Sequence, residues 1–250
     1  MELSWKLGPG EISHLHAFVA KMSTNAFVRY RIKNNVETPP AVVAIERFWE
    51  IMVGCMLTSQ QRSGPGSPII RLISAQPFPL RYSRFLEMAE PEVEAQRILK
   101  EYGGIRFTTR IPQQLAANLR ALQSGLWQQT EQALQQVVNE SSPAAERIAA
   151  AFIDKHYQGF GPKQSRNLLQ ALWLSKYEIP IDSRITKWLN EFGFPIKLSS
   201  FALSDPDYYN LVSDGIQAMC QQSGLLPCVL DAAIFASFDG DARNDENIIW

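Results

Sequence analysis

The chain has 250 residues, of which 46% are hydrophobic and 20% charged, and its formal net charge is -1. This composition is typical of a globular protein with a buried core and excludes a disordered, collagen-like or coiled-coil chain. No stretch approaches the ~20 uninterrupted apolar residues that a membrane span requires. The first residues also lack the pattern of an export signal. We therefore expect a cytoplasmic protein with no membrane partner.

The spacing of apolar residues predicts helices along nearly the whole chain. Apolar side chains recur three and four residues apart within 45–56, 168–173 and 226–234, as on one face of a helix. Residues 104–109 are the only modest candidate for a strand. Breaks at Pro and Gly divide the chain into about ten short helices with tight connections. These patterns predict an all-α fold.

Cysteine and histidine are too few and too scattered to suggest a metal centre. Cys55, Cys220 and Cys228 form no close pair and leave an odd count, which argues against a disulfide framework or a four-thiolate cage. His14 and His16 are two residues apart and would point to different faces of a helix. We expect buried free thiols and no metal ligand set.

Charge is distributed unevenly along the chain. Residues 155–188 contain six basic and two acidic side chains, whereas residues 198–250 contain eight acidic side chains and one arginine. Such a run is often only a solvated face, but a basic stretch also suits a nucleic-acid contact.

A glycine-rich turn follows the predicted helix that contains Phe152. Gly159-Phe160-Gly161-Pro162-Lys163 leads directly into the next helix. Glycine allows a tight reversal, and proline suits the first position of a helix because it has no amide hydrogen to leave unpaired. A helix-hairpin-helix of this kind presents free amides that can hold a DNA phosphate. Any other pair of helices with a Gly-rich turn would share these features.

A second segment makes the hairpin more informative. Pro180-Ile181-Asp182 places an aspartate 19 residues after Lys163, at the start of another predicted helix. Alone, Asp182 would pass as a helix N-cap, and Lys163 as a solvated or phosphate-contacting lysine. The pairing of the two residues is therefore the informative feature.

These residues resemble the signature of the helix-hairpin-helix DNA glycosylase superfamily, a Gly-x-Gly-x-Lys hairpin followed by apolar-Pro-apolar and an aspartate. The segment 56–61, Met-Leu-Thr-Ser-Gln-Gln, is similar to the Leu-Ser-Gln-Gln corner of the family. Ser183 and Arg184 depart from the pattern, because the family usually has a histidine two residues beyond the aspartate. The resemblance covers roughly residues 45–195.

The resemblance implies a fold and a branch of the superfamily. It implies two helical lobes with the active-site cleft between them, one lobe formed by residues 1–59 and 180–250 and the other by residues 60–179. Lysine at position 163 is similar to the lyase-competent branch. Since only Cys220 and Cys228 lie near the C-terminus, no iron–sulfur cluster is expected, and 8-oxoguanine DNA glycosylase is the closer likeness. A monovalent cation at the hairpin is compatible with the resemblance, but we expect no other cofactor.

The resemblance also implies roles for individual residues. Lys163 and Asp182 would be catalytic and would titrate as a pair, with Asp182 also able to accept the proton of the lysine. The remaining site residues fall into contacts with DNA, at Gln60, Gln61, Gly159, Gly161 and Arg166, and a base pocket, at Asn167, Phe235 and Phe238. The two glutamines would also fit a polar helix end, and the two phenylalanines would also fit core packing.

Three functions remain open at this stage. The first is a bifunctional glycosylase and abasic-site lyase that excises an oxidised purine such as 8-oxoguanine through a Schiff base on Lys163. The second is a monofunctional glycosylase for another lesion, in which Lys163 only contacts phosphate. The third is a non-catalytic helix-hairpin-helix module. In each case the expected partner is double-stranded DNA, damaged in the enzymatic cases and lying across the basic stretch, and we expect a monomer.

Overall fold

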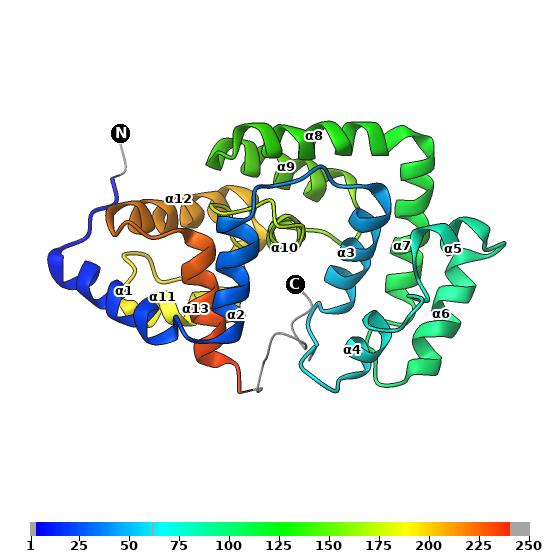
Figure 1. The fold of residues 1–250 in the computed structure, drawn as a ribbon, viewed down its shortest axis with the longest axis horizontal. Coiled ribbons are helices and arrows are strands. Elements are labelled where there is room, and N and C mark those ends of the chain that lie inside the picture. The colour runs from blue at the N-terminus through cyan, green and yellow to red at the C-terminus, as the bar shows by residue number, and fades with distance from the viewer. Residues whose placement is uncertain (1–3, 62, 241–250) are drawn as a thin grey trace.

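The computed structural model describes residues 4–61 and 63–240, which form helices joined by short loops (Figure 1). The α-helices are α1 (Pro9–Met22), α2 (Ala26–Arg31), α3 (Ile45–Leu57), α4 (Pro68–Ile73), α5 (Tyr82–Glu87), α6 (Pro91–Tyr102), α7 (Arg110–Ala121), α8 (Trp127–Glu140), α9 (Pro143–His156), α10 (Pro162–Ala171), α11 (Ser183–Phe192), α12 (Pro206–Gln222) and α13 (Pro227–Phe238). Short π-helical turns η1 (Ile32–Glu37) and η2 (Leu122–Leu126) and a 3-10 turn η3 (Ala202–Ser204) complete the set. The described residues contain no strand, so residues 104–109 form a loop and the all-α prediction is confirmed.

Proline starts many of these helices. It is the first residue of α1, α4, α6, α9, α10, α12 and α13. Its fixed φ suits a first helical turn, and its missing N–H would have no acceptor there in any case. The prolines that mark breaks in the sequence therefore lie at the starts of helices, and the connections between helices are short.

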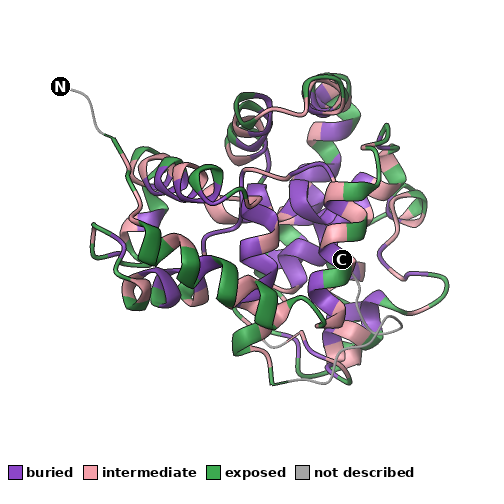
Figure 2. Cartoon of the chain, turned by 60° about the vertical axis from the view of Figure 1, so that its left-hand side comes forward, coloured by how far each residue is buried: buried purple, intermediate pink, exposed green. Residues whose placement is uncertain are grey.

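The larger apolar core is built around α3 and α10. Its buried residues run from Val43 to Leu174 and include Phe48, Trp49 and Leu168, each 0% exposed. Figure 2 shows buried residues concentrated on the central helices, with exposed residues on the outer faces of the peripheral ones. This core fixes the position of α10 and of the turn that precedes it.

The smaller core joins the two ends of the described chain. Leu15 of α1 packs with residues from Ile179 to Ile234, so the N-terminal segment and α11–α13 share one interior. Figure 1 shows α1, α2 and α11–α13 grouped on one side of α10, and α3–α7 on the other. The chain crosses between the two cores at residues 175–178.

The expected boundary at residue 59 requires a correction. We expected the segment of α3 in the discontinuous lobe, but its buried side chains belong to the larger core, with residues 69–174. The physical reason is that α3 is apolar on nearly every side, with Ile51 to Leu57 all buried, and such a helix belongs in the middle of a core. The first crossing between the cores therefore precedes α3.

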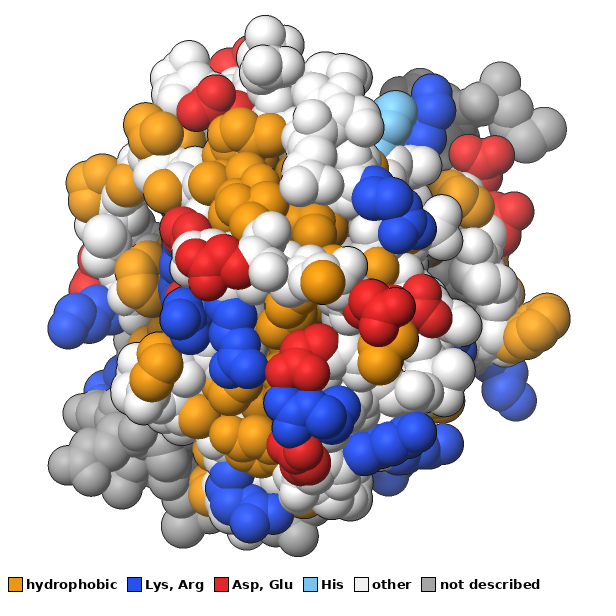
Figure 3. All heavy atoms as spheres, turned by 90° about the vertical axis from the view of Figure 1, so that its right-hand side faces the viewer, with side chains coloured by type: hydrophobic (Ala, Val, Ile, Leu, Met, Phe, Trp, Pro, Cys, Tyr) orange, Lys and Arg blue, Asp and Glu red, His pale blue; other side chains and the backbone are white. Residues whose placement is uncertain are grey.

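The face formed by α5–α7 carries charges of both signs. Figure 3 shows basic and acidic side chains interspersed there, and Glu94 pairs with Arg84 at 3.3 Å and with Arg97 at 2.6 Å. A DNA-binding face needs an excess of positive charge along the phosphates. This side of the molecule therefore does not have the electrostatic character of a DNA surface.

Within the described chain, no individual helix combines the length and apolar character of a membrane span. Only α12 and α13 considered as one unit, with a 100° bend between them, meet those criteria.

Candidate active site

A cleft of about 670 Å³ lies where the two cores meet. Residues 58–61, 63, 64 and 161–164 line it on one side, and residues 181–184, Ser200, Leu203, Ser204, Phe235 and Asp239 complete the lining. A smaller pocket of about 150 Å³ adjoins it and shares Lys163, Asp182, Arg184 and Phe235 with it. The predicted amine and carboxylate thus face one connected hollow.

The glycine-rich turn has the geometry that a hairpin requires. Gly159 has φ +88°, and a Cβ there would lie 2.8 Å from Oε1 of Gln114, so both the backbone and the neighbouring side chain favour glycine. The buried amide of Asn118 accepts from the Gln158 N–H at 2.8 Å and donates to the Gln158 carbonyl at 3.0 Å, which anchors the start of the turn.

Gly161 has a different environment from Gly159. It is the N-cap of α10 with φ −137°, and open space surrounds the position of a Cβ. Gly161 lines the large cleft, beside the amides that begin α10 and have no acceptor within the helix. An anion could approach this helix end without meeting a side chain.

Lys163 occupies the second position of α10, on the wall of both hollows. Its Nζ donates to Oε1 of Gln164 at 3.0 Å, and Gln164 in turn donates to the carbonyl of Cys55 at 2.6 Å. Burial lowers the pKa of Lys163, while the charge of Asp182 raises it. A lysine amine that is partly desolvated on a cleft wall is favoured to become neutral, as a nucleophile must be.

Asp182 is the N-cap of α11 and is held by four donors. Its Oδ1 accepts from the backbone N–H of Arg184 at 2.8 Å and of Ile185 at 3.1 Å. Its Oδ2 accepts from Nε and Nη2 of Arg184 at 2.8 and 2.5 Å. The N-cap role and the cleft-facing role therefore coexist in one carboxylate.

Tyr209 fixes the segment that delivers Asp182 to the cleft. Its hydroxyl donates to the carbonyl of Ile179 at 2.8 Å and accepts from the N–H of Ile181 at 2.6 Å. Tyr209 is 0% exposed in the middle of the smaller core. The apolar-Pro-apolar segment thus has its backbone groups satisfied by one buried phenol, which sets where α11 begins.

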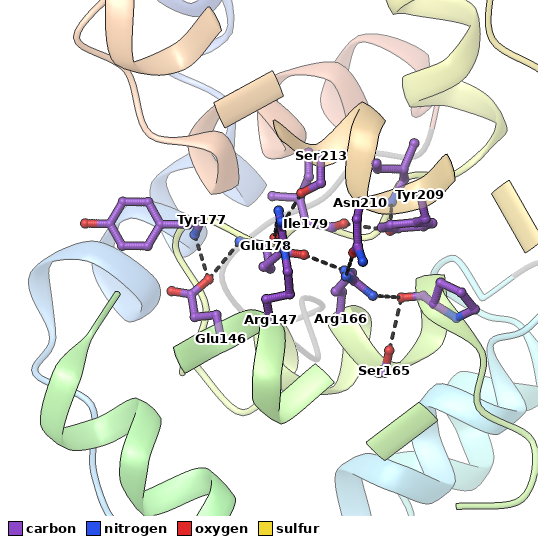
Figure 4. A network of polar contacts seen from close by, with 12 residues as sticks. Glu146, Arg147, Ser165, Arg166, Tyr177, Glu178, Ile179, Tyr209, Asn210 and Ser213 are labelled. Carbon is purple, nitrogen blue, oxygen red and sulfur yellow. Dashed lines mark hydrogen bonds and ion pairs between the residues drawn. The ribbon is translucent and has the colours of Figure 1, made fainter. Parts of the chain in front are cut away.

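Arg166, which was predicted to contact DNA, is enclosed within the protein instead. It is 3% exposed, and its Nε donates to Oε2 of Glu178 at 2.6 Å (Figure 4). It also donates to the carbonyl of Pro162 at 3.0 Å and to Oδ1 of Asn210 at 2.8 Å, and its guanidinium lies 4.4 Å from the Tyr209 ring centroid. A side chain so enclosed cannot reach a phosphate. The basic stretch therefore presents fewer charges outward than its sequence suggests.

This network ties the hairpin helix to the crossover. Glu178 also accepts from Arg147 Nε at 2.9 Å and Ser213 Oγ at 3.1 Å. Glu146 receives the backbone N–H groups of residues 176–178 at 2.7–2.8 Å (Figure 4). Two carboxylates that are both 0% exposed thus organise the loop between α10 and Ile179. The distance between Lys163 and Asp182 along the cleft depends on this buried network.

The smaller pocket contains ionisable groups that the sequence analysis did not identify. Asp231 of α13 is 7% exposed, and its Oδ2 accepts from Nε2 of Gln170 at 3.0 Å. Burial raises its pKa to about 6. Arg31 lines the same pocket, and its Nε is buried without a hydrogen-bond partner. Asn167, predicted for the base pocket, also lies here and donates to Sγ of Cys55 at 3.3 Å.

The two predicted aromatic residues of α13 differ in position. Phe235 lines both hollows, 4.5 Å from Phe27 between ring centroids. Phe238 is 38% exposed and lines neither hollow, and Nζ of Lys187 lies 5.2 Å from its ring centroid. Phe238 is the last residue of α13 and lies outside both hollows, so the structure gives no support to its predicted place in the base pocket.

The two predicted glutamines also differ. Both line the large cleft, but Oε1 of Gln61 accepts the N–H of Arg106 at 2.8 Å and its Nε2 donates to the carbonyl of Leu57. Gln61 therefore braces the turn after α3. Gln60 is exposed, and its positive φ of +56° turns the backbone sharply at the edge of the cleft. Of the two, Gln60 is the more exposed.

A search of the described residues for groups of three or more His, Cys, Asp or Glu that could hold a metal ion finds none. Cys55, Cys220 and Cys228 are free and buried.

No protein-family model matches the sequence, and no curated protein matches it. Among solved structures, the 8-oxoguanine DNA glycosylase of Methanocaldococcus jannaschii is similar, with a TM-score of 0.66 and 17% identity over 95% of this chain and 100% of that one. The same glycosylase/lyase in complex with a 15mer DNA containing 8-oxoguanine gives a TM-score of 0.66 and 16% identity, covering 92% and 100%.

The chain has a helix-hairpin-helix DNA glycosylase fold. The 8-oxoguanine DNA glycosylase of Thermotoga maritima also matches, with a TM-score of 0.59 and 12% identity over 94% of this chain and 97% of that one. The predicted fold is thus confirmed. At such identities the similarity shows the fold alone.

Signals for the missed residues were present in the sequence. Gln170 lies seven residues after Lys163 and three residues after Asn167, so all three share one face of α10. Asp231 is the single charged residue of α13, and a lone carboxylate within an apolar helix is a candidate functional group. Arg31 gave no comparable signal, because only the fold brings α2 beside α13.

Proposed function

We propose that this protein is a bifunctional DNA glycosylase and abasic-site lyase of base-excision repair that acts on an oxidised purine such as 8-oxoguanine. One observation carries the proposal: Lys163 and Asp182 line the same cleft, directly after a helix-hairpin-helix turn and a buried crossover. The similarity to structures of 8-oxoguanine DNA glycosylases supports the choice of reaction class.

The reaction begins at the sugar of an extruded nucleotide. Enzymes that act on a base must flip it out of the duplex, and the exposed Gln60 at the cleft edge is suited to fill the vacated space. The bond from C1′ to the base breaks, and its electrons leave with the base, which takes up a proton. Positive charge develops on the sugar, and Asp182 stabilises it.

Lys163 then forms the covalent intermediate. Its neutral Nζ bonds to C1′ and loses a proton, the sugar ring opens, and a Schiff base results. Loss of the C2′ proton next allows the bond from C3′ to its phosphate oxygen to break, which nicks the strand. An ordinary lysine, with a pKa near ~10.4, is neutral in about one molecule per thousand at pH 7.5. Burial, which lowers the pKa of Lys163, raises that fraction.

The base would enter the smaller pocket. Phe235 offers a ring face at the junction of both hollows, and Asn167, Gln170 and Asp231 provide polar groups deeper inside. Hydrogen-bonding groups of this kind discriminate strongly between bases, because a wrong base leaves them buried without a partner. An oxidised purine carries additional N–H and C=O groups that such a pocket can read.

A duplex-cleavage assay tests this function. Duplexes that carry 8-oxoguanine, other lesions or an abasic site are incubated with wild type, Lys163→Gln and Asp182→Asn, and base release and strand nicking are measured separately. We expect release and nicking from 8-oxoguanine in wild type, both lost in Lys163→Gln, and a loss of roughly 10²–10³-fold in Asp182→Asn.

The assay separates the proposal from its two alternatives. If Lys163→Gln still releases base and only Asp182→Asn does not, the enzyme is a monofunctional glycosylase. If wild type binds the duplexes but releases no base from any of them, the chain is a binding module, and the enzymatic proposal is contradicted.

A further inference from the structure

Arg184 contacts both the predicted carboxylate and the predicted stacking ring. Its Nε and Nη2 donate to Oδ2 of Asp182 at 2.8 and 2.5 Å. Its Cζ lies 4.3 Å from the centroid of the Phe235 ring, within the range of a cation–π contact. Arg184 lines both the cleft and the smaller pocket. One guanidinium therefore occupies the junction between the position for the sugar and the position for the base.

We propose that Arg184 is the positioning residue of this site: it holds Asp182 in place for the sugar, and it sets its positive charge on the wall of the same two hollows that Lys163 lines. The inference rests on the proposed function, since it concerns the same lysine and aspartate.

The first part of the inference follows from the hydrogen bonds of Asp182. Backbone N–H groups of α11 occupy Oδ1, and the side chain of Arg184 occupies Oδ2. Turning the carboxylate toward Lys163 would break these bonds. In the structure the ion pair of Asp182 is with Arg184, at 2.5 Å, while Nζ of Lys163 donates to Gln164 at 3.0 Å. Arg184 therefore prevents Asp182 from capturing the lysine as an ion-pair partner.

The second part follows from the charges around Lys163. Asp182 and Arg184 approach it from the start of α11, Cys55 from α3 and Asp231 from α13. Burial lowers the pKa of Lys163 most, the two carboxylates and Cys55 raise it, and Arg184 lowers it. Burial also raises the pKa of the Cys55 thiol to about 12, so that the thiol carries no charge at neutral pH. Arg184 is thus the charged neighbour that acts in the same direction as burial.

The pH dependence of the reaction tests this role. Single-turnover nicking of a lesion duplex is measured from pH 5.5 to 10 for wild type, Arg184→Gln and Arg184→Lys. We expect Arg184→Gln to move the rising limb of the profile upward by about one pH unit, which is roughly tenfold in rate below the pKa. Arg184→Lys should recover most of the shift, because it restores the charge without the two-pronged geometry.

A matched control and a DNA-free measurement complete the test. Lys187 lies one turn further along α11 and is exposed, with its side chain near Glu191, so Lys187→Gln removes a charge from the same helix and should leave the profile unchanged. Competitive acetylation of the free protein, followed residue by residue by mass spectrometry, reports the pKa of Lys163 without DNA. We expect that pKa to be about one unit higher in Arg184→Gln than in wild type.

Each outcome bears on a different claim. A loss of rate in Arg184→Gln that is equal at every pH, with an unchanged acetylation pKa, would overturn the inference and leave Arg184 with a purely structural role. An unchanged profile would overturn it as well. If wild type nicks no duplex, the proposed function fails, while the acetylation experiment still decides whether Arg184 favours the neutral lysine.

Discussion

Two cations on the same helix, only three residues apart, have opposite surroundings. Arg166 is 3% exposed and donates to Glu178, Asn210 and the Pro162 carbonyl. Lys163 lies on a cleft wall, and its Nζ donates to the side chain of Gln164. A buried charge whose donors are all used stabilises one structure, whereas a partly desolvated charge with few partners has an altered pKa and is available for chemistry. Helix α10 carries both kinds.

The largest loss of stability should come from replacing Arg166, the cation whose hydrogen-bond partners are all within the protein. Arg166→Met leaves Glu178, which is 0% exposed, without its closest guanidinium, and removal of one partner from a buried ion pair costs about 3–5 kcal/mol. Lys163→Met instead removes a desolvated amine and should leave the free energy of unfolding within about 1 kcal/mol of wild type. Urea denaturation of both variants measures the contrast, and equal losses in the two would contradict it.

The next effect concerns the carboxylate of the smaller pocket. Burial raises the pKa of Asp231 from 3.8 to about 6, a difference worth about 3 kcal/mol. Because the folded state holds this proton more tightly, wild type loses that stability as the pH rises from about 4 to above 6. Asp231→Asn has no titratable group at this position, so its stability does not fall with pH for this reason.

The stability of Asp231→Asn relative to wild type should therefore increase by about 2 kcal/mol between pH 4 and pH 7. Unfolding free energies of both proteins at several pH values provide the test. A constant difference between the two proteins across this range would show that Asp231 does not titrate as a buried acid.

The smallest effect compares the two glycines of the hairpin. Gly159→Ala imposes a side chain at φ +88° and 2.8 Å from Gln114, which should cost about 1–2 kcal/mol of stability. Gly161→Ala meets open space and should cost only a few tenths of a kcal/mol. It should nevertheless weaken binding to an abasic duplex several-fold, since its methyl group lies beside the helix end. Thermal unfolding and fluorescence anisotropy distinguish the two, and the opposite ranking in stability would contradict this account.

The sequence predicted the parts of the site that depend on local backbone chemistry. Gly159, Pro162 and Asp182 have residue types that nearly dictate a turn, a helix start and an N-cap, so their places followed from spacing alone. The all-α fold followed from periodicity in the same way. The placement of Lys163 beside Asp182 required the family resemblance as well, because 19 residues of chain separate them.

The remaining parts depend on contacts between segments far apart in the chain. Arg166 looked like a DNA contact because the sequence does not show that Glu178 and Asn210 would enclose it. The position of α3 was misjudged for the same reason, since its apolar surface can be assigned to a core only when its neighbours are known. Arg31 and Asp231 come from opposite ends of the chain, and only the packing of α2 against α13 brings them into one pocket.

Locating the covalent adduct tests the central claim most directly. Wild type is reacted with an 8-oxoguanine duplex, reduced with borohydride, and digested with nuclease and trypsin. Because trypsin does not cleave after a modified lysine, the account predicts a sugar-derived mass on the uncleaved peptide of residues 156–166, and its absence from Lys163→Gln. An adduct on any other amine, or one that persists in Lys163→Gln, would contradict the assignment of Lys163 as the nucleophile.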